Sequence, residues 1–344
     1  MTQETLERRE RRSRTRRPAA GIGLLIGVLG IAALFAVRAL SGDVNGLDLP
    51  NALQDLLTLS FSVIIESLGF VLLGILLSIV VQIWIPDRWI IRSLPHNPAL
   101  RRMALSLLGV FLPVCECGNV PLARGLIVKG FTVSESMTFL VAAPILNPVT
   151  IIVTHQVFGF DDGILIARLL GGFAIANLVG WLFSKHPDQD SLLTDRFTAE
   201  CVAGNDHDHP SDRWAASKDL FVRESGVIMP ALFFGAILAG LVQVLVPRPI
   251  LLALGSNPLW SVLALMVLAF VISICSNIDA FFILPFASTF LPGSIAAFLI
   301  LGPIIDIKML AMMRTTFRPG TLLQLTVIVA LVSAIIGLVM NYVG

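Results

Sequence analysis

The sequence predicts an all-α polytopic membrane protein: two inverted repeats with re-entrant or broken helices meeting at the midplane, plus one extra N-terminal helix. Three observations lead to this fold. Of the 344 residues, 56% are hydrophobic and 14% are charged, whereas about a quarter of a soluble domain is charged. Several apolar runs reach the roughly 20 residues that span a bilayer as a helix. Finally, parts of the first half of the chain recur in the second half.

The N-terminal part, taken first, predicts a cytoplasmic tail and an anchor. Residues 1–18 carry seven arginines, and residues 19–55 contain an apolar run at 19–40 followed by an outer loop. That run is too long for a signal peptide and lacks a small-residue cleavage pattern. Because the net charge is only +1 and no zinc-finger spacing occurs, the sequence excludes nucleic acid as a partner.

Two related repeats follow, at 56–184 and 226–344. The first contains apolar runs at 56–85 and 163–183, and the second contains runs at 226–246, 321–343 and 295–313, the last interrupted by a proline and charges. Residues 185–225 lack helical apolar periodicity and predict a hydrophilic cytoplasmic linker. Its motif NDHDHP at 205–210 offers His207 and His209 to a metal, but two histidines are an incomplete site, which favours a solvated loop.

Polar breaks interrupt two further apolar regions, 103–159 and 259–291. The breaks are VCECGNVP at 114–121, PILNP at 144–148 and CSNID at 275–279. Unwound backbone at membrane depth survives only where protein or a water-filled cavity satisfies its polar groups. We therefore expect these three segments to line an interior site.

The internal repeat aligns two of these breaks. Residues 74–86 match 235–247 at five positions with an offset of 161, and residues 139–148 match 298–307 at four positions with an offset of 159. The intermediate offset of 160 places Cys115 on Cys275 and Asn119 on Asp279. The sequence thus predicts two related hairpin tips that face each other.

Loop charges give the orientation, because short cytoplasmic loops are enriched in Lys and Arg. The tail, the loop 86–102 with its four arginines, the linker and residues 314–319 are predicted inside, whereas 41–55, 158–163 and 247–258 are predicted outside. A re-entrant hairpin at 103–130 reconciles these positions and makes the repeats inverted. If residues 103–122 instead cross fully, the repeats are parallel, and this alternative stays open.

Soft thiolates select copper(I), zinc or thiophilic metalloids, so the cysteines at the tips predict a thiophilic site. The predicted substrate-binding residues are Cys115, Cys117, Asn119, Asn147, Cys275, Asn277, Asp279 and Asp306, of which Cys115, Cys117 and Cys275 are the candidate metal ligands.

Intramembrane ionisable residues are functional candidates by default. Glu66 and Glu116 are assigned to a translocation or proton pathway, and Arg168 is a further candidate. Lys308 either neutralises Asp306 or extends to the cytoplasmic interface.

With C-x-C-G followed by proline, ARGLIVKG at 123–130, AAPILNP at 142–148 and CSNIDAF at 275–281, the chain resembles the ArsP/YraQ family of predicted permeases over about 57–340. The resemblance implies export of trivalent organoarsenicals by some members, a second subunit in others, and metalloid-handling roles for Cys115, Cys117 and Cys275. Glu116 replaces the usual serine between the thiols, and Asn119 follows the glycine. This carboxylate favours a metal cation such as zinc, or another soft solute, over an organoarsenical.

The predicted function is therefore a permease in the cytoplasmic membrane, with its N-terminus inside, that exports a thiophilic solute, metal ion or trivalent organometalloid. The expected partners are the bilayer, that solute and a second membrane or extracytoplasmic subunit, and no cofactor is expected. No G-x-x-x-x-G-K-[ST] motif for ATP occurs. The alternative is a membrane thiol-disulfide oxidoreductase using Cys115 and Cys117, although C-x-C differs from the usual C-x-x-C motif.

Overall fold

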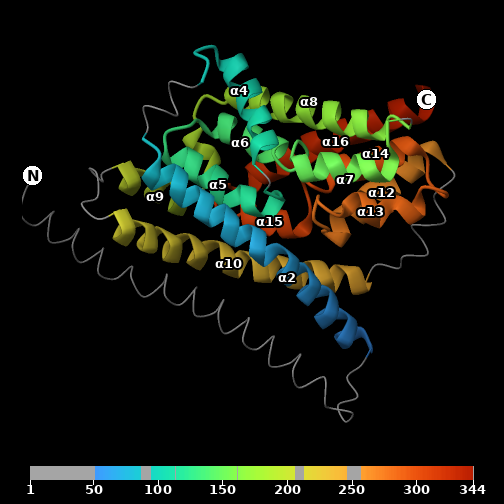
Figure 1. The fold of residues 1–344 in the computed structure, drawn as a ribbon, viewed down its shortest axis with the longest axis horizontal. Coiled ribbons are helices and arrows are strands. Elements are labelled where there is room, and N and C mark those ends of the chain that lie inside the picture. Colours follow the sequence, from blue (N-terminus) through green and yellow to red (C-terminus); the bar gives the residue numbers. More distant parts are fainter. Residues whose placement is uncertain are drawn as a thin grey trace, which may run out of the picture.

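A computed structural model describes residues 51–86, 94–112, 114–160, 162–205, 213–245 and 257–343 (Figure 1). In these residues every regular element is helical, apart from one isolated antiparallel bridge between Leu193 and Phe317. The all-α prediction is thereby confirmed for the described part of the chain. The predicted tail, the helix at 19–40 and the side chains of the linker motif at 205–210 lie outside it.

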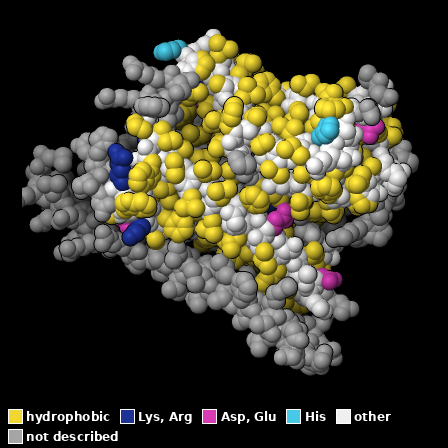
Figure 2. Space-filling view, viewed as in Figure 1, with side chains coloured by type: hydrophobic (Ala, Val, Ile, Leu, Met, Phe, Trp, Pro, Cys, Tyr) yellow, Lys and Arg dark blue, Asp and Glu magenta, His cyan; other side chains and the backbone are white. Residues whose placement is uncertain are grey.

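Four of the described helices are long and apolar enough to cross a membrane. They are α2 (Asn51–Ile79, continued by the π-helical turn η1, Val80–Trp84), α8 (Ile164–Ser184), α10 (Arg213–Leu245) and α16 (Pro319–Val343). Each turns large apolar side chains outward, for example Ile65, Leu170, Phe234 and Leu331. Hydrophobic side chains also cover most of the described face in Figure 2, which suits contact with lipid.

Shorter helices lie between the long helices of each half, and their order is similar except for the 3-10 turn, which precedes α5 but follows α13. The first half has α4 (Pro98–Leu107), η2 (Leu108–Phe111), α5 (Glu116–Val128), α6 (Val133–Ala142) and α7 (Pro148–Phe158). The second half has α12 (Pro258–Ile272), α13 (Asp279–Ile283), η4 (Leu284–Phe286), α14 (Pro292–Leu301) and α15 (Ile307–Met313).

One predicted span differs from the structure. The run 295–313 is two helices, α14 and α15, separated by residues 302–306. Pro303 has no backbone N–H to continue the helix, and Asp306 begins α15 as its N-cap by accepting a hydrogen bond from the Met309 amide. The break therefore corresponds to the PILNP break between α6 and α7, where Asn147 is the N-cap of α7.

The backbone repeats at the aligned breaks as well. The Cys115 carbonyl accepts hydrogen bonds from the amides three and four residues later, and the Cys275 carbonyl does the same. The Ala142 and Leu301 carbonyls, at an offset of 159, also accept from the third and fourth following amides. These matched turns support the internal repeat at the offsets derived from the sequence.

Helices α2 and α10 pack against each other in opposite directions (Figure 1). Trp84, at the end of η1, contacts Trp214 at the start of α10, with ring centroids 5.4 Å apart. At the other end, Gly240 of α10 lies against Ser60 of α2. We call the end of the bundle at which residues 185–205 lie the linker side, and both tryptophans lie toward it.

On the linker side α4 begins and α5 ends. Arg101 of α4 forms an ion pair with Glu135 of α6 at 3.0 Å, and the adjacent Ser134 amide donates to Gln189 of the linker. Near the end of α5, Arg124 forms an ion pair with Glu200 of the linker. Residues near the start of α4 and near the end of α5 thus both lie beside the linker.

In the second half, the starts of α12 and α14 both contact the end of α16, which lies opposite the linker side. Asn341, near the end of α16, donates to the Pro258 carbonyl at the start of α12 and accepts from the Gly293 amide at the start of α14. The starts of α12 and α14 therefore both lie beside the end of α16.

The linker contains more structure than its sequence pattern indicated. It includes η3 (Asp190–Leu192) and α9 (Asp195–Asn205), and α10 starts well before Gly226. Leu192, Leu193 and Phe197 are buried, so this segment is packed onto the bundle. Its few apolar residues are too widely spaced to produce the periodicity that predicts an amphipathic helix.

A close contact between α2 and α5 fixes the start of α5. A Cβ atom at Gly74 would lie 2.2 Å from the Gly118 carbonyl oxygen, and one at Gly118 would lie 2.5 Å from the Phe70 carbonyl oxygen. Two glycines therefore let the backbones approach more closely than any other residues could. This contact holds the C-E-C segment against the middle of α2.

Candidate functional site

Glu116, at the first position of α5, is the centre of a buried polar cluster between the two halves. Its Oε2 accepts hydrogen bonds from the Ser276 amide at 3.2 Å and the Ser276 hydroxyl at 3.0 Å. The Cys275 thiol also donates to Oε2 at 3.7 Å, and the Cys117 thiol donates to Oε1 at 3.9 Å. The structure thus brings the breaks at 114–121 and 275–279 together around one carboxylate.

Lys308 supplies the opposite charge. Its Nζ lies 3.1 Å from Glu116 Oε1 and 3.9 Å from Asp306 Oδ2, and it donates to the Ser273 carbonyl at 3.3 Å. Lys308 and Glu116 are fully buried, so the expectation that Lys308 extends to an interface is wrong. The sequence places Lys308 near Asp306, but only the fold shows that its closer partner is Glu116, which is 192 residues away.

Three free thiols surround this ion pair. Cys115, Cys117 and Cys275 are all buried, and ligand atoms of Cys115, Glu116 and Cys275 lie within 4.8 Å of one another. Two thiols and a carboxylate at this spacing form a donor set that suits a soft or borderline ion. The same thiols suit a metalloid compound that exchanges oxygen ligands for sulfur.

Asp279 lies in a separate buried ion pair with Arg168 of α8. Arg168 donates to both carboxylate oxygens, at 3.0 Å and 2.5 Å, and to the Thr154 hydroxyl at 2.7 Å. This fork-to-fork geometry joins α8 of the first half to α13 of the second half. Asp279 is thus held by a guanidinium. Its repeat counterpart Asn119 is fully buried, and neither of its side-chain polar atoms has a hydrogen-bond partner among the described residues.

The amides predicted as ligands lie at helix starts and breaks. Asn147 accepts from the Val149 amide as the N-cap of α7 and donates to the Val114 carbonyl at 3.0 Å, which fixes the backbone next to Cys115. Asp306 caps α15 in the same way, and its second carboxylate oxygen accepts no hydrogen bond from the part of the chain that the structure describes. Asn277 accepts a 3.4 Å hydrogen bond from Thr150 of α7.

Glu66 lies halfway along α2 and is partly exposed. It interacts electrostatically with Lys308, Glu116 and Cys275, so it belongs to the surroundings of the cluster. Because its neighbour Ile65 is 60% exposed on the lipid-facing side, Glu66 lies between the cluster and the apolar outer surface.

The chain is similar to known membrane proteins over most of its length. A family described as "Predicted permease", of the ArsP type, matches residues 52–342. The protein named UPF0718 protein YcgR of Bacillus subtilis is 34% identical over 286 residues, covering 79% of this chain and 92% of its own. A Streptococcus mutans protein named "Putative two-component membrane permease complex subunit" is 32% identical over 285 residues, covering 80% of this chain and 91% of its own.

UPF0718 protein YraQ of Escherichia coli is 30% identical over 117 residues, covering 33% of this chain and 32% of its own. No solved structure matches the chain. The family match, the long apolar helices and the buried site between two repeated halves agree with the resemblance seen in the sequence, and this chain belongs to the ArsP family of predicted permeases.

Proposed function

We propose that this chain is a secondary transporter that exports a thiophilic solute across the cytoplasmic membrane through the cluster around Glu116. The observation that carries the proposal is the convergence of three buried thiols on one carboxylate, at the point where breaks from both halves meet. Buried polar groups at broken helices are costly, so a binding role accounts for their presence. Family membership favours transport over the oxidoreductase alternative.

We propose further that the two halves are inverted repeats. Residues near the start of α4 and near the end of α5 lie beside the linker, whereas the starts of α12 and α14 lie beside the end of α16, opposite the linker side. The antiparallel packing of α2 and α10 also supports inversion over the parallel alternative. In such folds the substrate site lies where the repeats meet, near the midplane. With the basic loops inside, the N-terminus and the linker are cytoplasmic.

The charge of the cluster favours an uncharged trivalent organometalloid over a metal dication. The Lys308 ammonium neutralises Glu116 and opposes an approaching cation, which the sequence alone did not indicate. A compound R–As=O reacts with two thiols to give R–As(SR)₂ and one water, without a change in net charge. Cys115 and Cys275 are the proposed thiol pair, because their sulfur atoms lie within 4.8 Å of each other.

A second subunit is part of this proposal. The Streptococcus mutans relative is named as one subunit of a two-component permease complex, and it covers most of this chain. We propose that the present chain also acts beside a partner, which co-purification of the tagged chain from its own membranes would detect.

The experiment that tests the function is uptake of phenylarsine oxide into everted membrane vesicles, with export appearing as accumulation inside. Cys115→Ser and Cys275→Ser should abolish uptake without reducing the amount of inserted protein. Cys201→Ser is the matched control, because Cys201 lies in α9, away from the cluster, and should leave uptake unchanged. Zinc and copper(I) uptake by the same vesicles separates the solute classes. Equal uptake of all three solutes with and without the cluster thiols would reject the proposal.

A further inference from the structure

The linker helix α9 covers the linker-side end of two short helices that begin at the thiol cluster. Helix α5 starts with Glu116 and α15 starts next to Asp306, so both run from the cluster toward the linker side. The turn after α15 forms a backbone hydrogen bond with the linker, from the Thr194 amide to the Thr316 carbonyl at 2.9 Å. A solute that leaves the cluster along these two helices therefore meets α9.

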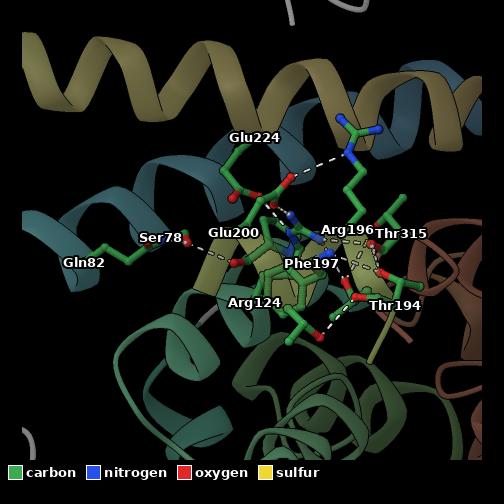
Figure 3. Close-up of polar contacts among 12 residues, drawn as sticks. Ser78, Gln82, Arg124, Thr194, Arg196, Phe197, Glu200, Glu224 and Thr315 are labelled. Atoms are coloured by element: carbon green, nitrogen blue, oxygen red, sulfur yellow. Dashed lines mark hydrogen bonds and ion pairs between the residues drawn. The ribbon is translucent and has the colours of Figure 1, made fainter. Parts of the chain in front are cut away.

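Arg124 of α5 holds α9 in this position (Figure 3). Its Nη2 lies 2.9 Å from Glu200 of α9, its Nε lies 2.9 Å from Glu224 of α10, and its guanidinium lies over the Phe197 ring at 4.3 Å from the centroid. Arg124 also donates to the Thr316 hydroxyl at 3.1 Å. One buried cation thus joins α9 to elements of both halves.

Arg124 and Glu200 each have a second partner of opposite charge, so the contact between α5 and α9 can open and close again. If α9 moves away, Arg124 keeps Glu224, which is fixed on the long helix α10 and is 3% exposed. Glu200 keeps Arg196, one turn earlier on α9, at 3.6 Å. Arg124 and Glu200 thus each keep an oppositely charged partner, so opening does not incur the free-energy cost of leaving a buried charge unpaired.

We propose that α9 is the linker-side gate of the permease, closed in this structure and locked by the ion pair between Arg124 and Glu200. This inference rests on the proposed function, because it regulates access to the same cluster. Arg124 is eight residues after Glu116, so the lock lies roughly 12 Å from the site along α5. Glu224 holds Arg124 in place when the gate opens, and Phe197 leaves its pocket with α9.

Cys201 is a native reporter of the gate, because it follows Glu200 on α9 and is half-buried. Glu200→Gln removes one charged hydrogen bond of the lock, and alkylation of Cys201 in the folded protein should then be about tenfold faster or more. The rates are compared at equal thiolate fraction, because burial and the Glu200 charge both raise the pKa of the Cys201 thiol. Asp195→Asn is the matched control on the same helix, since Asp195 forms an ion pair with the exposed Arg318 and with no other described residue. It should change the rate by less than about twofold. Equal Cys201 rates in Glu200→Gln and wild type would overturn the lock.

A reversible cross-link tests the gate itself. Thr194 and Thr316 lie opposite each other beside the Leu193–Phe317 bridge, so Thr194→Cys with Thr316→Cys, in a Cys201→Ser background, can form a disulfide. Phenylarsine oxide uptake should stop after oxidation and return after mild reduction, whereas oxidised single Thr194→Cys stays active. Unchanged uptake in the cross-linked form would overturn the gate. If wild type moves no thiophilic solute, the proposed function fails, and Cys201 alkylation still decides the lock.

Discussion

The ion pair between Lys308 and Glu116 gives the sharpest prediction about the cluster. The two charged groups are fully buried and 3.1 Å apart, so their attraction amounts to about 5 kcal/mol at an effective dielectric constant of about 20. Lys308→Met leaves the carboxylates of Glu116 and Asp306 without their cation and should lower the free energy of unfolding by about 3–5 kcal/mol. Glu116→Gln should cost less, because Asp306 still lies 3.9 Å from the ammonium.

A double-mutant cycle tests this reasoning. The free energy of unfolding of the purified protein in detergent, followed by circular dichroism during denaturant titration, is measured for wild type, both single variants and the Lys308→Met, Glu116→Gln double variant. The double variant should be about 1–3 kcal/mol more stable than the sum of the single effects indicates. Additive effects, within about 0.5 kcal/mol, would show that Lys308 does not neutralise Glu116.

Three further predictions concern other parts of the molecule. Gly74→Ala should lower the free energy of unfolding by about 1–3 kcal/mol, because the new methyl group would clash with the backbone of α5. Gly69→Ala on the same helix is the control and should have no such effect, because its new methyl group has no atom within 4 Å. Arg168→Met should lower the free energy of unfolding by about 3–5 kcal/mol. Arg168→Lys should lower it less, because lysine retains the charge although it loses the two parallel hydrogen bonds to Asp279. Similar losses for both variants would argue against the bidentate pair. Burial raises the pKa of the Cys201 thiol to about 11. Its alkylation rate in the folded protein, followed by peptide mass spectrometry, should therefore rise about tenfold per pH unit up to pH ~10, whereas the rate in the unfolded chain should level off near pH ~9. A rate that levels off near pH ~9 in the folded protein would contradict this burial.

Apolar run length and repeated motifs predicted the long helices and the alignment of the two halves. Four predicted spans are long helices, because about 20 consecutive apolar residues have few other solutions in a membrane. The run 295–313 was predicted as one span and is two helices, since its proline and Asp306 form a break like that at PILNP. The internal repeat contained this information, because it aligned Asp306 with Asn147.

The sequence could not predict which charges pair, because ion pairs depend on contacts between residues far apart in the chain. Glu116 suggested a cation site until the structure placed Lys308 beside it. Asp279 was expected with the thiols, but it pairs with Arg168, 111 residues away. Arg124 lies within the predicted hairpin 103–130, and its contacts with Glu200 and Glu224 depend on how the linker packs.

The most direct test of the proposed thiol site is binding of phenylarsine oxide to the purified full chain. Binding is measured by the loss of free thiols and by mass spectrometry of the adduct. One arsenical should bridge Cys115 and Cys275, and this adduct should be lost in Cys115→Ser and in Cys275→Ser but retained in Cys201→Ser. An adduct that persists in both serine variants, or one that depends on Cys201, would contradict it.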